Sequence, residues 1–288
     1  MEPIINNLKE TIASLINIQD ASFRTITTLK DLLIEFQTKI YQHMHPNPLN
    51  QFGLKCFSQS DEDGITIEIL QRLKIKKGVY AEIGVGNGLE NNTLILVAMG
   101  WKGFWVGNED LAFSYSPSSK FNYFKTWLTK DNVLDVIQSG MNSIDEREID
   151  VISIDVDGND IYLANQLLIN GIRPKIFIIE YNGQFVPPTK FQIEYNQLHV
   201  WQGDNFYGAA LSNLDELFRL YDYRLICCNS QSGVNAFFIK NEYNELFLDV
   251  PNDIRKIYSP PRYNLLDKYG HKQSHKTIEK IFQDLNKI

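Results

Sequence analysis

The chain has 288 residues, of which 43% are hydrophobic and 22% are charged, as in a globular protein that buries a core. Its 28 basic and 35 acidic residues give a formal net charge of −7 at pH 7. A groove for nucleic acid needs clustered Lys and Arg to neutralise phosphates. No such run occurs, so we expect no nucleic-acid partner.

The three cysteines indicate a reducing compartment. Their number is odd, and Cys227 and Cys228 are adjacent. No two of the three have the CxxC spacing of a zinc or redox motif. We therefore expect a cytoplasmic protein. The first residues do not combine a basic region with an apolar run, so we expect no signal peptide. No stretch of about eighteen apolar residues occurs, so we also expect no membrane span.

Residues 1–45 form the first predicted segment, which is helical. Apolar residues recur between residues 5 and 40 in alternating steps of three and four, a spacing that supports a coiled coil. Gln19 and Ser22 are polar interruptions in the same frame. The segment predicts a homo-oligomer, most simply a dimer. The alternative is an amphipathic helix or helical hairpin that packs on its own domain. The apolar positions are Ile5, Leu8, Ile12, Leu15, Ile26, Leu29, Leu33, Phe36 and Ile40.

Residues 46–245 form the second predicted segment, an α/β domain. Pro46 and Pro48 break the helix and mark a linker, and Ser60 is expected to cap the helix that follows. Beyond it, short β-rich runs alternate with helical stretches, which predicts parallel strands in a doubly wound sheet. These runs span residues 79–83, 103–106, 123–128, 151–155 and 176–180.

The end of this domain differs from its beginning. After a helix near residues 211–221, two β-runs (223–229 and 234–240) are joined by the short polar link SQSG, which predicts a hairpin. The sheet is therefore expected to be mostly parallel with an antiparallel end. Residues 246–288 are predicted to form a tail with a short final helix near 277–285.

A glycine-rich loop follows the first strand, in the sequence VYAEIGVGNGLENNT. A dinucleotide-binding fingerprint would need its third glycine where this chain has Leu89, which argues against an NAD-dependent oxidoreductase. The loop, with Glu82 at the strand end, instead resembles motif I of class I methyltransferases, which bind S-adenosylmethionine. The resemblance implies that Glu82 lies near the cofactor's ammonium group, with Asn92 and Thr93 nearby. The alternative is a glycine-rich turn without a ligand. The loop glycines are Gly84, Gly86 and Gly88.

The second strand should end in an acid that holds ribose hydroxyls. Methyltransferases that this chain resembles place this acid directly after the strand, where this chain has Gly107. Glu109 is the nearest acidic residue that could take its place, and Asp110 follows it. A solvated turn is the other interpretation of Glu109.

Acidic residues also follow the next two strands. Asp155 and Asp157 end one strand ahead of a helix, and Glu180 and Asn182 follow the next. Carboxyl ends of parallel strands form the ligand crevice of such sheets, so these groups should converge. Carboxylates that converge repel one another unless a cation, a proton or a ligand separates them. The cation could be the cofactor's sulfonium, Mg²⁺ or Mn²⁺. The alternative is simple helix capping by Asp157 or Asp160.

The segment between Asn182 and the last helix is too long and too rich in aromatic and polar residues to be an idle connection. It suits a lid over a polar, sugar-bearing acceptor, and His199 is a candidate general base. A surface role for His199 remains the alternative. The lid residues are Trp201, Asp204 and Tyr207, with Gly203 and Gly208 as flexible points.

The motifs EDGI (62–65), EIGVGNGLENNT, GWKGFWVG, DVISIDVDGND, IEYNG, WQGDNFYGAAL and GVNAFFI together resemble FkbM-like methyltransferases. This resemblance covers residues 57–240. It implies a seven-stranded class I sheet and S-adenosylmethionine-dependent O-methylation of a sugar or other hydroxyl, commonly in bacterial surface-glycan biosynthesis. Expected catalytic residues are Asp157, Glu180, Asn182 and His199. Expected cofactor-binding residues are Glu82, Gly84, Gly86, Gly88, Asn92, Thr93, Glu109 and Asp155.

Two other functions stay open. Asp155 and Asp157 form a D-x-D pair that could hold a metal and a nucleotide diphosphate, as in a glycosyltransferase. The upstream glycine loop and the terminal hairpin argue against this function. The second is a non-catalytic binding protein that keeps the fold and oligomerises through its N-terminal helix, because fold alone does not determine function.

Overall fold

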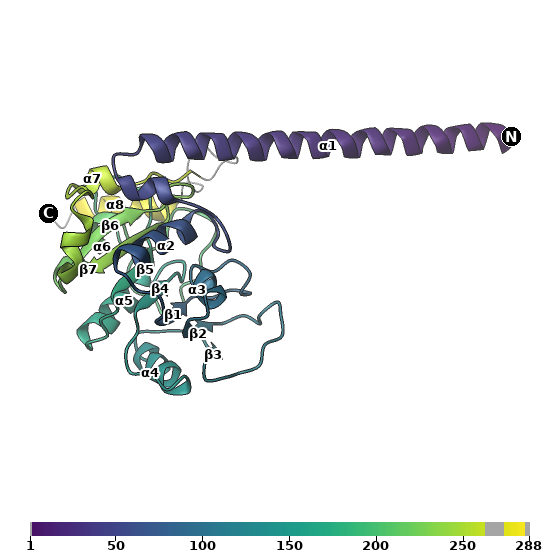
Figure 1. The fold of residues 1–288 in the computed structure, drawn as a ribbon. Helices are drawn as coiled ribbons and strands as arrows, with labels where there is room; N and C mark the ends of the chain where they lie inside the picture. The colour runs from purple at the N-terminus through teal and green to yellow at the C-terminus, as the bar shows by residue number, and fades with distance from the viewer. Residues whose placement is uncertain (1, 263–273, 286–288) are drawn as a thin grey trace. The chain divides into compact units, whose positions relative to one another are not determined.

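The computed structural model describes residues 2–262 and 274–285 (Figure 1). The chain divides into two compact units, residues 1–44 and 45–288. The first is a single helix, α1 (Glu2–Met44), and the second is an α/β unit built on one sheet. Among the described residues, no helix combines the length and the apolar character that crossing a membrane requires.

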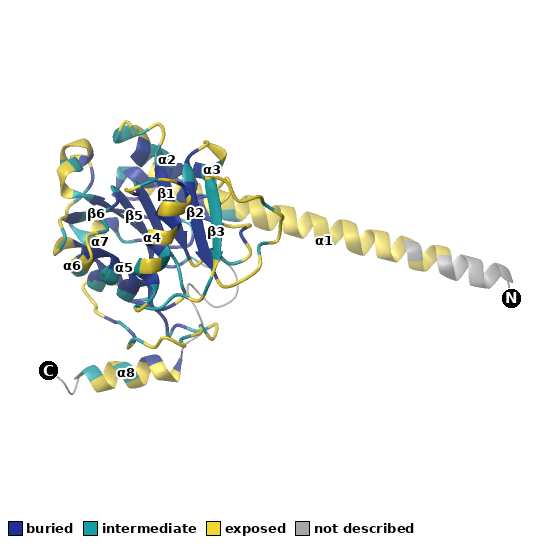
Figure 2. Ribbon diagram, turned by 90° about the horizontal axis from the view of Figure 1, so that it is seen from below, coloured by how far each residue is buried: buried dark blue, intermediate teal, exposed yellow. Residues whose placement is uncertain are grey.

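Helix α1 confirms the predicted N-terminal helix and is unbroken over 43 residues. Most of its described apolar side chains are exposed, and Figure 2 shows the described part of the helix mainly in yellow. Of the positions predicted to form an apolar seam, Ile5 and Leu8 lie outside the described side chains. The remaining seven are all exposed: Ile12, Leu15, Ile26, Leu29, Leu33, Phe36 and Ile40.

The α/β unit contains a seven-stranded sheet in the order β3-β2-β1-β4-β5-β7-β6. Strands β1 to β5 pair in parallel, and β7 lies between β5 and β6, antiparallel to both. The predicted mostly parallel sheet and its terminal hairpin are confirmed. The strands are β1 (Val79–Ile83), β2 (Lys102–Gly107), β3 (Phe121–Lys125), β4 (Val151–Ile154), β5 (Ile176–Glu180), β6 (Tyr223–Cys228) and β7 (Asn235–Lys240).

Helices connect and flank these strands (Figure 1). Every residue of β1, β4 and β5 is buried (Figure 2), as expected for parallel strands whose two faces are both covered. The carboxyl ends of these strands are therefore the place where loops can form a site. The helices are α2 (Glu62–Arg72), α3 (Leu94–Ala98), α4 (Val133–Ser143), α5 (Asp160–Ile169), α6 (Leu211–Arg219), α7 (Ile254–Ile257) and α8 (His275–Leu285), with 3₁₀ turns at Pro48–Phe52 and Asn241–Phe247.

Two local predictions need correction. The strand expected at residues 123–128 is β3, which starts two residues earlier and ends at Lys125, so residues 126–128 lie beyond the sheet. Ser60 does not cap α2, because the capping position is Asp61. The Ser60 hydroxyl instead donates to the buried carboxylate of Glu62 at 2.9 Å, which needs that donor inside the unit.

Candidate functional site

A cavity of about 240 Å³ lies at the carboxyl ends of β1, β2, β3 and β4. This is the edge at which open α/β sheets bind ligands. Its walls carry the carboxylates of Glu109, Asp155 and Asp157, and among the described residues that line it there is no Lys or Arg. The cavity is therefore acidic. The lining residues are Gly84, Gly86, 106–109, 126–128, 155–157, Asn159 and 199–201.

The glycines of the loop after β1 have different roles. Gly84 has a φ of +92°, and a side chain there would overlap the backbone oxygen of Asp155, so this glycine lets β1 and β4 close together. Gly88 also has a positive φ, of +81°. Gly86 faces the cavity, and a Cβ built there would have the Glu109 Oε2 atom, 4.0 Å away, as its nearest neighbour. Gly86 thus keeps open space for a ligand.

Glu82 lies beside this loop but does not line the cavity. Its Oε1 atom accepts a hydrogen bond from the Asn92 N–H at 2.8 Å. Its Oε2 atom accepts from the N–H and the hydroxyl of Thr93, at 3.0 and 2.5 Å. Burial raises the pKa of Glu82. Backbone amides at the start of such a helix are where a pyrophosphate binds in dinucleotide folds. Here an internal carboxylate already occupies them.

Asn92 and Thr93 are likewise used inside the unit. The Asn92 amide donates to the Ser153 hydroxyl at 3.1 Å, and the Trp105 indole N–H donates to the Thr93 hydroxyl at 2.9 Å. Both residues are buried and neither lines the cavity. The three polar residues predicted around the glycine loop therefore hold β1, β2 and β4 to the start of α3.

Glu109 and Asp110 follow β2, and the structure separates their roles. Asp110 forms an ion pair with Lys125 at 2.7 Å. Glu109 lines the cavity, and its carboxylate lies closest to Gly86. The Tyr123 hydroxyl donates to the backbone oxygen of Glu109 at 2.6 Å and so fixes this turn. Of the two acids, Glu109 is the one placed to meet a ligand.

Asp155, Asp157 and Glu180 come together as predicted, with one carboxylate oxygen of each within 4.8 Å of the others. Asp157 is exposed, whereas Glu180 is buried and its Oε2 atom has no hydrogen-bond partner. Burial and the neighbouring Asp155 carboxylate raise the pKa of Glu180 well above its ordinary value. Burial and the carboxylate of Asp157 raise the pKa of Asp155 in the same way. Three oxygen ligands in this arrangement could hold Mg²⁺ or Mn²⁺.

Asp160, by contrast, is a structural residue. Its two carboxylate oxygens accept hydrogen bonds from the N–H groups of Val156 and Gly158, both at 2.8 Å. These bonds close the loop that presents Asp155 and Asp157, and Asp157 itself has a φ of +54°. The capping position of α5 is Asn159, whose side chain makes no capping bond.

Asn182 anchors the segment that leads from β5 to α6. Its amide donates to the backbone oxygens of Asn205 and Tyr207, both at 3.0 Å, and its side-chain oxygen accepts from the Gln184 N–H. The side chain is fully buried and lines neither cavity of the site. Asn182 therefore joins the two ends of the segment.

The predicted lid is fastened to the rest of the unit. The indole N–H of Trp127 donates to Gln197 O at 2.7 Å, and the Tyr162 hydroxyl donates to Ile193 O at 2.7 Å. The Asn159 amide donates to Asn196 O at 2.9 Å. Gly203 and Gly208 both adopt positive φ angles. The segment covers one side of the acidic cavity with His199, Val200 and Trp201.

His199 lies between two cavities. Its Nε2 atom is 3.1 Å from the backbone oxygen of Asp157, and because a carbonyl only accepts, Nε2 carries the hydrogen. The Nδ1 atom then has a free lone pair. Burial lowers the pKa of His199, which favours the neutral ring that a general base requires.

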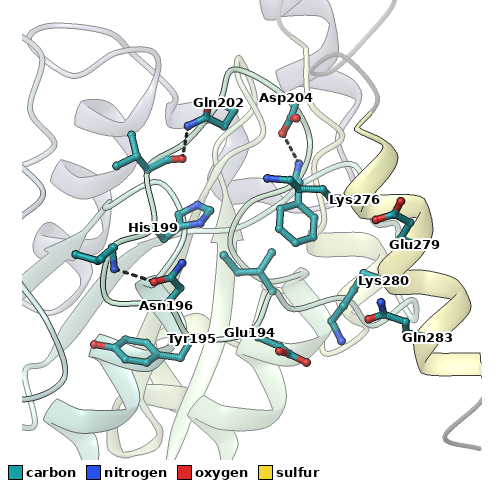
Figure 3. Close-up of a pocket in the computed structure, with 14 residues that line it drawn as sticks. Glu194, Tyr195, Asn196, His199, Gln202, Asp204, Lys276, Glu279, Lys280 and Gln283 are labelled. Carbon is teal, nitrogen blue, oxygen red and sulfur yellow. Dashed lines mark hydrogen bonds between the residues drawn. The ribbon is translucent and has the colours of Figure 1, made fainter.

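The second cavity is larger, about 680 Å³, and lies between residues 193–206 and helix α8 (Figure 3). His199 and Val200 line both cavities. The Asn205 side-chain oxygen anchors α8 by accepting from Ser274 N and the Thr277 hydroxyl, at 2.8 and 2.9 Å. The walls combine the rings of Tyr195 and Phe206 with polar side chains, among them Glu194, Asn196, Gln202, Lys276 and Glu279.

Part of this site was not predicted from the sequence. Four residues that line the acidic cavity were not among the predicted site residues: Asn108, Thr126, Trp127 and Asn159. Thr126 and Trp127 were missed because the predicted strand extended to residue 128. A strand end at Lys125 would have placed them at the ligand edge. Nothing in the sequence links α8 to residues 193–206.

Comparisons with known proteins do not identify a family. No family model matches the chain, and no curated protein matches it. A solved Lactococcus lactis protein, provisionally described as a hemolysin, is 11% identical with a TM-score of 0.40, covering 65% of this chain and 90% of its own.

Two further solved structures are described as proteins of biosynthetic pathways. The MycE methyltransferase of the mycinamycin pathway, in complex with Mg, SAH and mycinamycin VI, is 12% identical with a TM-score of 0.29. The match covers 40% of this chain and 31% of the MycE chain. A protein from echinomycin biosynthesis, where a disulfide bond becomes a thioacetal group, is 9% identical with a TM-score of 0.33. The match covers 89% of this chain and 99% of that protein. These low values carry no argument about function, which must come from the site.

Proposed function

We propose that this chain is an S-adenosylmethionine-dependent O-methyltransferase. The observation that carries the proposal is the acidic lining of the cavity at the carboxyl edge, which has three carboxyl groups and, among the described lining residues, no Lys or Arg. Such a cavity repels phosphates and favours a ligand with cationic groups. S-adenosylmethionine has two, a sulfonium and an ammonium.

The glycine loop supports the same choice of cofactor. Dinucleotides place a pyrophosphate on the amides at the start of the first helix, but Glu82 holds those of Asn92 and Thr93. The seven-stranded sheet, in which parallel strands end in an antiparallel hairpin, resembles that of class I methyltransferases. The sequence motifs that resemble FkbM-like methyltransferases point the same way.

The lining residues divide naturally between the parts of this cofactor. Glu109 would accept hydrogen bonds from the ribose hydroxyls, because it follows β2 and faces Gly86. Asp155 and Asp157 would face the cationic end. Gly84, Gly86 and Gly88 would shape the loop around the ligand, with Glu82, Asn92 and Thr93 supporting it from behind.

The larger cavity would hold the acceptor, and His199 would stand between acceptor and cofactor. When bound, S-adenosylmethionine would supply an activated methyl group for an acceptor oxygen, with S-adenosylhomocysteine as the leaving group. His199 would take the hydroxyl proton on Nδ1 and release it to solvent. The bond from Nε2 to Asp157 O would hold the ring in place.

The acceptor class follows from the walls of that cavity. Amides, carboxylates and the Lys276 ammonium offer both donors and acceptors, without one charge dominating, beside the rings of Tyr195 and Phe206. A hydroxyl-rich molecule such as a sugar fits this mixture. We propose a role in bacterial surface-glycan or related biosynthesis in the cytoplasm, where sugar donors and precursors are made.

A divalent metal is the alternative to the cofactor's cationic end as the cation that these carboxylates would hold. Asp155, Asp157 and Glu180 offer oxygen ligands within 4.8 Å of one another, and the buried Glu180 Oε2 atom has no hydrogen-bond partner. A bound metal would supply a positive charge that lowers the pKa of an acceptor hydroxyl. Calorimetry with Mg²⁺ and Mn²⁺ tests this alternative. Binding to the intact protein but not to Glu180→Gln supports it, and equal binding to both variants contradicts it.

A thermal-shift screen tests the function itself. S-adenosylhomocysteine should raise the melting temperature, whereas NAD and a UDP-sugar with Mn²⁺ should not. Stabilisation by the UDP-sugar alone would favour the glycosyltransferase. No stabilisation by any nucleotide would favour a non-catalytic protein. Methyl transfer from labelled cofactor to a panel of sugars then identifies the acceptor.

A further inference from the structure

Helix α1 exposes an apolar face without any role in the proposed site. At about 1.5 Å per residue its 43 residues span about 65 Å. Helices in water owe most of their stability to packing of an apolar face. In α1, Phe23 is 71% exposed, Ile26 65% and Phe36 64%. Side chains of this size in solvent call for a partner.

The face follows a heptad repeat. Positions a and d, which form the seam of a coiled coil, hold Ile12 and Leu15, Ile26 and Leu29, and Leu33 and Phe36. The opposite face, position f, holds only polar residues between residues 10 and 38: Glu10, Asn17, Arg24, Asp31 and Thr38. β-branched Ile at a with Leu at d is typical of two parallel strands.

We propose that α1 pairs with α1 of a second copy of this chain, parallel and in register. In this pairing each a or d side chain meets the same residue of the second copy. Gln19 and Ser22 occupy one a and one d position, so in register each meets its own counterpart and, at the a and d positions, no polar side chain faces an apolar one. A polar residue at an a position is a known device that sets register.

The positions that flank the seam agree with this direction. In a parallel pair, position g of one helix lies opposite position e of the next heptad in the other helix. Ile18 then meets Phe23 of the second copy, which are both apolar and exposed in the single chain. Lys30 meets Thr25 of the second copy, so no like charges oppose each other there. The second copy thus covers Ile18 and Phe23 as well as the seam.

Disulfide trapping in the full-length protein tests this pairing. Cys56 is exposed and is first replaced by Ser, while Cys227 and Cys228 are buried. In this background, Leu29→Cys places a thiol at a d position, and Asp31→Cys places a matched one on the polar face two residues away. Parallel pairing brings only the Leu29→Cys thiols together. Oxidation should therefore link most Leu29→Cys chains into dimers and few Asp31→Cys chains.

Light scattering on the unmodified chain and on a Leu29→Asp, Leu33→Asp variant completes the test. The unmodified chain should be oligomeric and the double variant monomeric, with unchanged melting of the α/β unit. A monomeric unmodified chain overturns the proposal, as does an oligomer that the double variant preserves. An oligomer in which Leu29→Cys fails to cross-link overturns the parallel direction. None of these outcomes depends on cofactor binding.

Discussion

The carboxyl edge of the sheet carries two kinds of acidic side chain. Glu82 and Asp160 each accept hydrogen bonds from two backbone N–H groups. Asp155, Asp157 and Glu180 each place one carboxylate oxygen within 4.8 Å of the others, and the buried Glu180 Oε2 atom has no hydrogen-bond partner. Both kinds come from similar positions at strand ends and loops. Their surroundings, rather than their sequence positions, separate them.

The hydrogen-bond partners of a carboxylate distinguish a structural side chain from a candidate for ligand binding. A carboxylate surrounded by donors stabilises the loop that supplies them, and its removal leaves those donors unpaired. Carboxylates that face one another cost stability unless a cation, a proton or a ligand separates them. A group of that second kind at a cavity is therefore a candidate for ligand binding.

The largest effect is expected for Glu82→Ala. Three buried donors of Asn92 and Thr93 lose their acceptor, so the free energy of unfolding should fall by about 3–5 kcal/mol. Urea denaturation measures this loss. Glu82→Gln keeps one oxygen acceptor and should lose less. If Glu82→Ala keeps its stability but no longer binds S-adenosylhomocysteine, Glu82 belongs with the ligand-binding kind.

Asp160 gives a prediction on pH. Burial raises its pKa to about 7, from about 4 in the unfolded chain. Its contribution to stability is therefore complete below about pH 4 and is lost as the pH rises through 7. Relative to Asp160→Asn, the intact protein should lose on the order of 1–3 kcal/mol between pH 5 and pH 8. Urea denaturation of both proteins at each pH checks the sign. A difference that grows in favour of Asp160 as the pH rises would contradict it.

Glu109 and Asp110 form a matched pair for cofactor affinity. Glu109→Gln removes a charged acceptor from the cavity and should weaken S-adenosylhomocysteine binding about tenfold. Asp110→Asn breaks only the exposed pair with Lys125 and should change affinity less than about twofold. Calorimetric titration gives both values. The reverse order would assign the ribose contact to Asp110.

The smallest change in stability is expected for Glu180→Gln. Removing one of three converging carboxylates relieves repulsion, so the free energy of unfolding should rise or change by less than about 1 kcal/mol. Turnover on a verified acceptor should still fall, and further than cofactor affinity does. A loss of stability as large as that of Glu82→Ala would place Glu180 among the supporting carboxylates.

The sheet and its ligand edge could be predicted because they depend on local patterns. Short apolar runs predict buried strands, and the residue after each strand predicts the edge that Asp155, Asp157 and Glu109 share. The roles of Glu82 and Asn182 could not be predicted, because their partners are chosen by the folded backbone. Asn182 bonds to Asn205 O, and Asn205 in turn holds Ser274, 69 residues further along. No sequence spacing encodes such contacts.

Titration of S-adenosylhomocysteine into the intact protein and into Gly86→Val tests the central claim most directly. A Cβ at Gly86 has no neighbour closer than 4.0 Å, so the variant should fold with an unchanged melting temperature while its side chain occupies the ligand space. The account predicts saturable binding to the intact protein and binding at least tenfold weaker in Gly86→Val. Equal affinity for both proteins, or no binding to the intact protein, would contradict it.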